Sequence, residues 1–474
     1  MRDQLKLYID GQWVAPHGDR TVEVVNPATE AVSGRLALGD AEDVNRAVKA
    51  ARQAFATYSL WSREDRVALF ERIVAQTEAR QADLAAAITE EMGAPDWLAL
   101  DGQAKMALDH ARIALDSLRT YAFDRPQGTT LVTLTPIGVC GLITPWNFPA
   151  GVVMCKVLPA LATGCTVVLK PSEYTPYSAR IIAEIMHDAG VPAGVFNLVF
   201  GDAPTVGDAL SGHPDVDMVS ITGSTRAGIA VAINAAGTVK RVHQELGGKS
   251  ANIILPSADI DAAVQRGVKT LMMNSGQGCS LPSRMIVPNA RMEEVKAAVG
   301  KAASQVQPGP AGSNAFMGPV VNKNQYDSIQ AMIEAGVAEG ATVVMGGPGK
   351  PEGLETGFYI KPTVFADTTP EMSIVRQEIF GPVLVIQGYD DVEQAVVLAN
   401  DTEYGLAAYV EGGDLAEVRA IAARLPAGQV YLNGAAMDLT APFGGFKQSG
   451  NGREWGPYAF EAFLETKAIV GYGA

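Results

Sequence analysis

The sequence predicts an α/β protein built on a doubly wound parallel sheet, and three observations carry that prediction. Short apolar runs alternate with helical segments from residue 164 onward, in units of about 25 to 30 residues. A second alternating series starts at residue 248. The length of 474 residues gives room for two or three domains of ~150 residues each.

The opening part of the chain is expected to be largely helical after a short β segment. Residues 7–9 and 22–25 have the composition of strands, and Asp10-Gly11 is typical of a hairpin turn. Apolar side chains recur at helical spacing on one face of the segment that starts at Asp40. The same pattern predicts helices over residues 40–55, 65–79, 81–91 and 98–118.

The central part of the chain supplies the predicted sheet. Residues 129–135 alternate and are rich in β-branched side chains, so they predict a strand that two subunits can share at an edge. Buried parallel strands are expected at residues 166–169, 195–200, 216–221 and 240–244, with helices at 176–189 and 204–210 and another that follows the loop 223–228 and ends at residue 236. The second series adds strands at 251–255, 285–287, 341–345 and 383–386, and a helix at 259–273.

Composition excludes several classes of protein. The chain is 47% hydrophobic and 19% charged, as expected of a globular protein with a large core. A net charge of −15 argues against a nucleic acid partner, which needs clustered Lys and Arg. Four unpaired cysteines and five scattered histidines suit a reducing compartment without a metal site. With no apolar run of membrane-spanning length, a cytoplasmic location without membrane partners is expected.

Two short motifs carry the candidate chemistry. Cys279 lies in a loop with Gly276 and Gly278, where a thiol is a plausible nucleophile and its own backbone amide a plausible oxyanion donor. Glu245 ends a predicted strand and becomes a general base if burial raises its pKa. The alternative for Cys279 is simple packing, which is the reading we favour for the three cysteines in apolar runs, Cys140, Cys155 and Cys165.

Two loops follow predicted parallel strands, at the edge where such sheets bind ligands. One runs from Lys170 to Glu173, and the other from Gly223 to Gly228. The second feeds the amino end of a helix, whose free amides attract phosphate. It matches neither a dinucleotide fingerprint nor a Walker loop, so an ordinary strand-to-helix turn stays open as an alternative.

With these motifs placed, the chain resembles the NAD(P)-dependent aldehyde dehydrogenase superfamily over essentially its whole length. Seven motifs occur in the family's order: Thr144-Pro145-Trp146-Asn147-Phe148-Pro149, Lys170-Pro171-Ser172-Glu173, Thr222-Gly223-Ser224-Thr225, Glu245-Leu246-Gly247-Gly248-Lys249, Gly276-Gln277-Gly278-Cys279, Glu378-Ile379-Phe380-Gly381-Pro382 and Pro442-Phe443-Gly444-Gly445-Phe446-Lys447-Gln448-Ser449-Gly450. The resemblance implies a Rossmann-type NAD-binding domain (1–119 and 138–247), a catalytic domain (248–445) and a small β oligomerisation segment (120–137 and 460–474).

The resemblance also implies a role for each matching position. Cys279 corresponds to the nucleophile, Glu245 to the general base and Asn147 to the oxyanion-binding amide, and Lys170 counts with this catalytic set as well as with the cofactor set. The cofactor positions implied are Thr144, Trp146, Lys170, Ser172, Glu173, Gly223, Ser224, Leu246, Glu378 and Phe380. The substrate tunnel implied is apolar and lined by Phe148, Val152, Met437 and Phe443.

The implied reaction oxidises an aldehyde to a carboxylic acid through a thioester on Cys279, which water activated by Glu245 then hydrolyses. A carboxylate at Glu173 favours NAD, because it would repel a 2′-phosphate; Lys170 nearby leaves NADP use open. The alternatives are a coenzyme A-acylating or NADP-preferring semialdehyde dehydrogenase of the same fold, an enzyme for phosphorylated substrates, a non-catalytic binding protein, and a cysteine hydrolase without nucleotide. The expected assembly is a homo-oligomer, either a dimer or a homotetramer.

Overall fold

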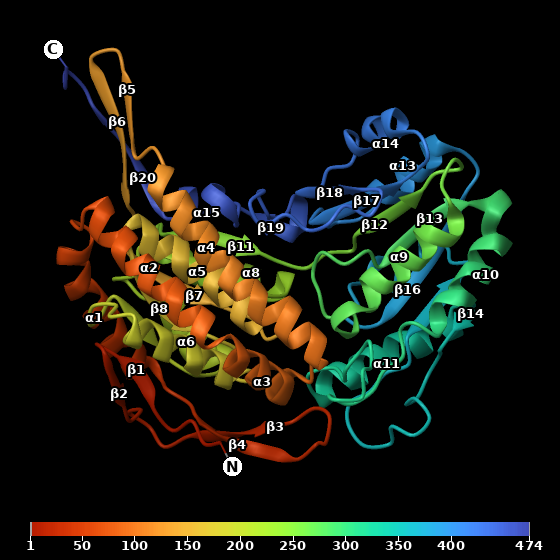
Figure 1. Cartoon of the computed structure of the whole chain (residues 1–474), viewed down its shortest axis with the longest axis horizontal. Helices are drawn as coiled ribbons and strands as arrows, with labels where there is room; N and C mark the ends of the chain where they lie inside the picture. Colours follow the sequence, from red (N-terminus) through yellow and green to blue (C-terminus); the bar gives the residue numbers. More distant parts are fainter. Residues whose placement is uncertain (1, 474) are drawn as a thin grey trace.

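The computed structural model describes residues 2–473 and contains two large sheets, each flanked by helices, with a third, antiparallel sheet that projects from one end (Figure 1). Met1 and Ala474, which end two of the predicted domain segments, lie outside the described residues. Apart from the edge strand β19 (Gly450–Asn451), which joins the first sheet, the two large sheets come from consecutive halves of the chain, as the two alternating series predict. The α/β class is confirmed, and the predicted domain boundaries stay a prediction.

The amino-terminal β segment is a hairpin of β1 (Leu7–Ile9) and β2 (Gln12–Val14). Its turn has positive φ at Asp10 (54°) and Gly11 (75°), which accounts for the Asp-Gly pair. A second hairpin pairs β3 (Thr21–Val25) with β4 (Val32–Ala37). The predicted turn and the strand at residues 22–25 are therefore confirmed.

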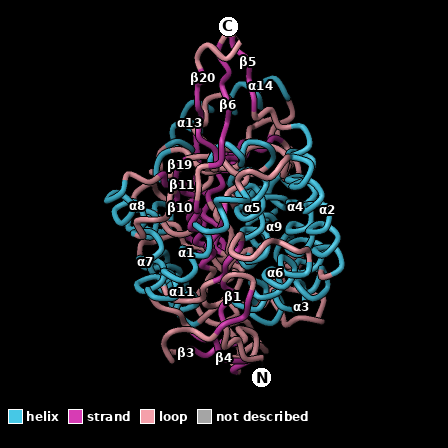
Figure 2. The backbone as a smooth tube through the Cα atoms, turned by 90° about the vertical axis from the view of Figure 1, so that its left-hand side faces the viewer, coloured by secondary structure: helices cyan, strands magenta, loops and turns pink. Residues whose placement is uncertain are grey.

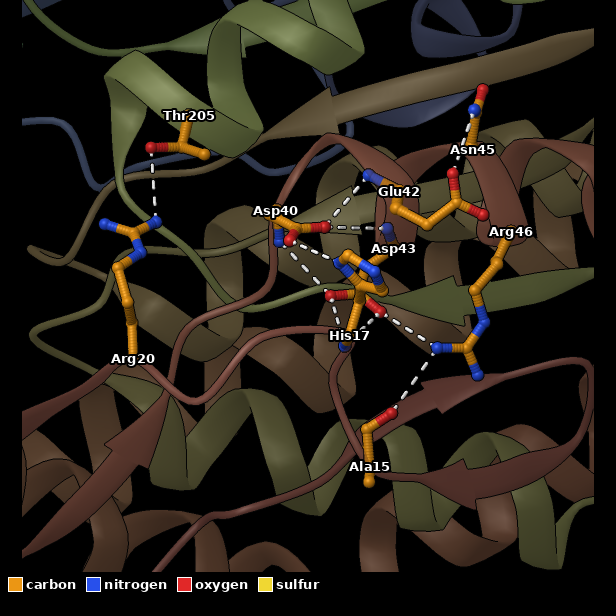
Figure 3. Close-up of polar contacts among 9 residues, drawn as sticks. All are labelled: Ala15, His17, Arg20, Asp40, Glu42, Asp43, Asn45, Arg46 and Thr205. Carbon is orange, nitrogen blue, oxygen red and sulfur yellow. Dashed lines mark hydrogen bonds and ion pairs between the residues drawn. The ribbon is translucent and has the colours of Figure 1, made fainter.

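Helix α1 (Ala41–Tyr58) begins where the sequence predicts, because Asp40 and Asp43 form a reciprocal capping box. Figure 3 shows how this end is tied to the preceding loop. The His17 ring contacts Asp40 at 2.8 Å, and Arg46 donates to Asp43 at 3.0 Å. These contacts fix the chain that leads into the first sheet.

The first sheet has the order β19-β11-β10-β7-β8-β9-β1-β2, with five parallel strands at its centre. Their bounds are β7 (Val139–Ile143), β8 (Thr166–Lys170), β9 (Phe196–Leu198), β10 (Met218–Thr222) and β11 (Arg241–Glu245). The strand order reverses between β7 and β10, so the crevice for a ligand lies at the carboxyl ends of these two strands. Strand β7 was not predicted as part of the sheet, because its apolar run follows β6 with only a short break.

Helices cover both faces of this sheet. Figure 2 shows α1, α7 and α8 on one side of the strands and α2, α4, α5 and α6 on the other. The helices not yet bounded are α2 (Arg63–Ala79), α3 (Gln81–Met92), α4 (Lys105–Thr120), α5 (Pro149–Thr163), α6 (Pro176–Asp188), α7 (Asp208–Gly212) and α8 (Thr225–Ala235). A π-helical segment (Leu98–Ala104) precedes α4, so the single helix predicted over residues 98–118 is two joined helical segments.

The second sheet has the order β14-β15-β16-β13-β12-β17-β18 and is parallel except for β14. Its strands are β12 (Ala251–Ile254), β13 (Arg284–Pro288), β14 (Thr342–Met345), β15 (Thr363–Ala366), β16 (Val383–Tyr389), β17 (Ala407–Glu411) and β18 (Gln429–Leu432). Its main helices are α9 (Ile260–Met272), α10 (Met292–Ala303), α11 (Lys323–Ala338), α13 (Val392–Asn400) and α14 (Leu415–Ala422). All four strands predicted for this half are present.

The third sheet pairs β6 (Thr130–Pro136) with β5 (Asp124–Gln127) on one side and with β20 (Leu464–Ile469) on the other. It joins the segments around residues 130 and 465 and extends beyond the rest of the molecule (Figure 1). The short helix α15 (Ala459–Ala462) precedes β20. Within residues 2–473, no helix is both long and apolar enough to cross a membrane.

Candidate active site

Glu245 and Cys279 come from different sheets and meet at one cavity. Glu245 is the last residue of β11, and Cys279 lies in the loop between α9 and β13. Both residues line a cavity of about 70 Å³, together with Asn147 from the loop after β7. The structure thus brings the three residues of the predicted reacting centre together next to the crevice between β7 and β10.

The nucleophile loop is held in an unusual backbone conformation. Asn274, Ser275 and Gly276 all have positive φ, at 54°, 57° and 73°. A Cβ on Gly276 would lie 2.0 Å from the carbonyl oxygen of Gly381, so both the φ and the close approach require glycine there. Gly278 is different, because its φ is not positive and a Cβ there would meet only the Leu281 side chain at 2.8 Å. Of the two glycines in this loop, only Gly276 is therefore required by its φ angle.

Asn147 is buried against this loop. Its side-chain Nδ2 donates to the carbonyl of Gln277 at 3.2 Å, and its own carbonyl accepts from Asn274 Nδ2 at 3.0 Å. Gln103 donates to both Asn147 and Asn274, at 3.3 and 3.2 Å. Because a side-chain amide has two N–H groups, Asn147 keeps one donor for the cavity.

Burial favours the protonated forms of both reacting groups. Removal from bulk water, with Glu378 and Glu245 nearby, raises the pKa of Cys279 to about 12. Burial, and then the neighbouring Glu454, raises the pKa of Glu245 well above its usual range. Both carboxylate oxygens of Glu245 are buried and make no hydrogen bond within residues 2–473. The site therefore holds a thiol and an acid whose next partner has to come from the cavity.

A buried ionic group lies behind Glu245. Lys156 of α5 pairs with Glu454 at 2.5 Å and donates to Ser220 Oγ at 2.9 Å. Ser220 Oγ lies 3.0 Å from His243 Nδ1, and His243 Nε2 lies 3.4 Å from Glu245 Oε1. All five side chains are at least nine-tenths buried. The Cys155 thiol donates to the other oxygen of Glu454 at 3.3 Å.

The rest of the cavity is mainly apolar. The four residues predicted for the substrate tunnel, Phe148, Val152, Met437 and Phe443, all line it. Phe443 stacks on Trp455 with ring centroids 4.3 Å apart. The remaining lining consists of Met106, His110, Gly151, Cys155, Thr222, Met273, Gly278, Ser280, Leu281 and Glu454. No Lys or Arg is among these lining residues.

The loop after β8 holds Lys170, Ser172 and Glu173 outside this cavity. Lys170 Nζ pairs with Glu173 at 3.3 Å, and Ser172 Oγ accepts from the Tyr174 amide at 3.2 Å. Glu173 keeps 28% of its side-chain surface exposed. Lys170 therefore lies with the predicted cofactor residues. It does not line the Cys279 cavity, where a catalytic residue would be expected.

The loop after β10 leads into the amino end of α8. Gly223 donates to the Glu245 carbonyl at 3.0 Å, and Ser224 caps the helix by accepting from Ala227. The Leu246 side chain fills the space beside Gly228, where a Cβ would lie 2.6 Å from Leu246 Cδ2. The backbone amides of the first turn of α8 are thus presented at the sheet edge, as the sequence predicts.

A third group of predicted cofactor residues lies between the two large sheets. The Trp146 ring meets Phe380 edge to face at 5.4 Å, and Glu378 accepts from the Gly248 amide at 2.8 Å. Burial raises the pKa of Glu378 to about 7. Thr144 Oγ1 is buried with no hydrogen-bond partner within residues 2–473. The ten predicted cofactor positions lie at the carboxyl ends of β7, β8, β10 and β11 or in the segment between α12 (Ser373–Arg376) and β16.

Several residues around the reacting centre were missed by the sequence analysis. Ser220, Glu454 and Trp455 were not singled out, and Cys155 was assigned to packing alone although its thiol bonds Glu454 and lines the cavity. Lys156 carried the clearest available signal, since it is a lone charge in the apolar run of α5, and such a charge requires a buried partner. Glu454 lies 298 residues away, so the sequence did not identify it as that partner.

Comparison with known proteins agrees with the geometry. The family model "Aldehyde dehydrogenase family" matches residues 13–469. A 3-succinoylsemialdehyde-pyridine dehydrogenase from a Pseudomonas species is 53% identical over 100% of this chain and 99% of its own length. A crystal structure of a mutant aldehyde dehydrogenase C from Pseudomonas syringae, complexed with NAD⁺ and octanal, is 52% identical in sequence, with a TM-score of 0.98. A crystal structure of an aldehyde dehydrogenase from Mycobacterium tuberculosis, complexed with NAD⁺, is 37% identical, with a TM-score of 0.96. These alignments cover 98% and 99% of this chain, and 96% and 98% of the others. The chain belongs to the aldehyde dehydrogenase family.

Proposed function

We propose that this member of the aldehyde dehydrogenase family oxidises an apolar aldehyde to its carboxylic acid with NAD as acceptor, using Cys279 as nucleophile and Glu245 as base. The observation that carries the proposal is the convergence of Cys279, Glu245 and Asn147 on one cavity from three separate segments. A simple packing role for Cys279 does not explain the strained loop that presents it or the unpaired carboxylate beside it.

In the first half of the reaction, the sulfur of Cys279 forms a bond to the aldehyde carbon. The thiol proton passes to the solvent as the carbon–sulfur bond forms, so Glu245 stays free to accept a proton in the second half. The carbonyl oxygen becomes an oxyanion, which the free N–H of Asn147 and the Cys279 backbone amide can bind. An uncharged amide suits this position because it adds no charge of its own to the cavity.

The three loop groups fit a dinucleotide. The amide-rich start of α8 suits a pyrophosphate, the Lys170–Glu173 pair offers both a donor and an acceptor for ribose hydroxyls, and Thr144 has a buried hydroxyl with an unused hydrogen bond. With a dinucleotide bound as hydride acceptor, the adduct carbon on Cys279 would lose its hydrogen as hydride; the oxyanion then re-forms a carbonyl, and Cys279 carries a thioester. Relatives at 52% and 37% identity are described in complex with NAD⁺, which supports the same cofactor here. Glu173 favours NAD over NADP because its carboxylate repels a 2′-phosphate.

In the second half, Glu245 removes a proton from water, and the resulting hydroxide attacks the thioester carbon on Cys279. The carbon–sulfur bond then breaks, the acid leaves, and the sulfur regains a proton. The raised pKa of Glu245 suits a group that must accept a proton from water and release it again during turnover. A hydrolytic base in the cavity also argues against the coenzyme A-acylating alternative, where a thiol takes the acyl group.

The lining of the cavity supports aliphatic or aromatic aldehydes, in line with the octanal named for the Pseudomonas syringae enzyme. The name of the 53% identical relative adds a second candidate, a semialdehyde that carries a pyridine ring. Stacked Phe443 and Trp455, with His110 beside them, favour that candidate because they can receive a flat heteroaromatic ring. We propose both substrates as members of one apolar class.

The projecting sheet of β5, β6 and β20 supports assembly into a dimer or tetramer. Its β6 strand is half-buried along its whole length, and Val470 and Tyr472 just beyond β20 are exposed. Such a sheet is too thin to bury its own apolar side chains, so a second subunit is the natural partner. A cytoplasmic location stays a prediction.

The test is a product balance with purified protein. Octanal and NAD should give reduced cofactor and octanoic acid in equal amounts, without added coenzyme A. A requirement for coenzyme A, or reduced cofactor without the free acid, would contradict hydrolysis at Glu245.

A further inference from the structure

His243 is a buried imidazole that the mechanism above does not use. It lies two residues before Glu245 on β11, so both side chains point to the same face of the sheet. On the adjacent strand β10, Ser220 is the register partner of His243. Lys156 approaches this face from α5. The four side chains form a continuous buried row that ends at the proposed general base.

The directions of the hydrogen bonds in this row follow from the donors available. An ammonium group only donates, so Lys156 gives a hydrogen to Ser220 Oγ at 2.9 Å. The serine hydroxyl then has its own single hydrogen to place, and His243 Nδ1 lies 3.0 Å away. If Ser220 donates to Nδ1, the neutral imidazole carries its hydrogen on Nε2. That nitrogen lies 3.4 Å from Glu245 Oε1.

The other tautomer leaves buried groups unsatisfied. With the hydrogen on Nδ1, the Ser220 hydrogen would have no other acceptor within residues 2–473, although Ser220 is fully buried. When Glu245 is ionised, as a base must be, the Nε2 lone pair would also face its oxygen, so two acceptors would oppose each other. Buried polar groups are rarely left in that state. The buried polar groups of this row are therefore all paired only when His243 carries its hydrogen on Nε2.

The imidazole stays neutral in this position. Burial, and then the nearby Lys156, lowers the pKa of His243 to about 4. The other titratable or charged groups facing Glu245 are Lys156 on α5, Glu454 and Arg453 after β19, and the thiols of Cys155 and Cys279. Lys156 is already paired with Glu454, and His243 Nε2 lies 3.4 Å from Glu245 Oε1.

We propose that His243 is a positioning residue for the general base, donating from Nε2 to the Glu245 carboxylate in the tautomer that Ser220 and Lys156 select. The proposal rests on the proposed function of Glu245. In this structure the 3.4 Å separation lacks the alignment of a hydrogen bond, and a small side-chain movement brings it into the range of about 2.7 to 3.2 Å. Such contacts commonly tighten when the substrate is bound.

The test compares His243→Leu, which removes the donor, with His243→Gln, which keeps an N–H donor at similar length. The matched control is His213→Leu, since His213 contacts Asn45 and lies outside the cavity lining. First-turnover and steady-state rates of reduced-cofactor formation, and the pH profile of the steady-state rate, are measured for each. His243→Leu should slow the steady state about tenfold, the loss expected for one hydrogen bond to a charged group.

The pH profile of the steady-state rate is the measurement that decides whether His243 acts on Glu245. Loss of a donor to the ionised carboxylate raises the pKa of Glu245 further, so the acid limb of the profile should move to higher pH in His243→Leu. The limb should return toward its original position in His243→Gln and stay in place in His213→Leu. An unchanged limb in His243→Leu, or an equal fall of first-turnover and steady-state rates, would overturn the proposal.

Ser220→Ala provides a second route if His243→Leu does not fold. Without the serine hydrogen, the tautomer is no longer selected, so the acid limb should again move to higher pH. An unmoved limb in a folded Ser220→Ala protein would count against the proposal just as directly. Failure of the proposed function looks different, because the wild-type protein itself would then lack aldehyde-dependent turnover that requires Cys279.

Discussion

The cavity around Cys279 and the loop around Glu173 hold their carboxylates in opposite ways. Glu245 in the cavity is buried, and neither of its oxygens makes a hydrogen bond within residues 2–473. Glu173 in the loop after β8 is partly exposed and already paired with Lys170. The fold thus leaves the carboxylate of the proposed base without a partner and holds the carboxylate proposed to bind the ribose in an ion pair. Substitutions in the cavity should accordingly have far larger effects than substitutions in the loop.

The largest effect is expected at the nucleophile. Cys279→Ala removes the sulfur that bonds the aldehyde, so aldehyde-dependent formation of reduced cofactor should fall by about 10⁴-fold or more. Binding of NAD, followed by quenching of protein fluorescence, should persist because the loops after β8 and β10 are untouched. The control is Cys140→Ala, which alters a fully buried thiol on β7 away from the cavity lining. Turnover retained by Cys279→Ala would remove the thiol from the mechanism.

The next effect is expected at the base. Glu245→Gln keeps the shape of the side chain but cannot accept a proton from water, so deacylation should slow by about 10² to 10⁴-fold. Acylation should suffer less, and a rapid first turnover followed by a slow steady state is expected in stopped-flow absorbance. First-turnover and steady-state rates that fall together would show that the carboxylate does not serve hydrolysis in particular.

A smaller loss is expected at the oxyanion-binding amide. Asn147→Ala removes one neutral donor, and the typical cost of such a donor is about 10² to 10³-fold in kcat. The Asn147 backbone carbonyl, which accepts from Asn274, is kept in this variant, so the nucleophile loop should retain its fold. Thermal unfolding that matches the wild-type protein, together with the loss of kcat, is the expected pair of results. An unchanged kcat would leave the Cys279 amide as the sole oxyanion donor.

The smallest effect is expected in the loop. Glu173→Gln removes the negative charge without shortening the side chain, so the preference for NAD over NADP should relax by about tenfold. The control is Glu23→Gln, because Glu23 is an exposed carboxylate that lines the same surface pocket as Glu173. The ratio of kcat/KM for the two dinucleotides is the measurement. An unchanged ratio in Glu173→Gln would show that another group selects the cofactor.

The two regions also differ in how well the sequence predicts them. The sites in the loops follow directly from local pattern, because strands at residues 166–169 and 216–221 and the helix beginning after Gly223 were recognised from the residues alone. The positions of Cys279 and Glu245 were likewise recognised from short motifs, although the strained φ values at Asn274 and Ser275 were not expected of those residue types. A site residue can be predicted from the sequence when the residues that identify it lie within a few positions of one another.

The surroundings of Glu245 depend instead on contacts that no local pattern encodes. Lys156 and Glu454 meet across 298 residues, and Ser220 joins them through the register of β10 on β11. Strand β7 was also missed, although it forms one side of the switch point and positions Asn147. A fully apolar strand that closely follows another strand gives no change of period by which to recognise it.

The central claim is that a thioester forms on Cys279 and is hydrolysed by water that Glu245 activates. The most direct measurement is the intact mass of Glu245→Gln after brief mixing with octanal and NAD, with peptide mapping of the modified residue. The account predicts an added octanoyl group on Cys279, absent when NAD is omitted. No added acyl mass in a protein that still forms reduced cofactor, or an acyl group on another residue, would contradict it.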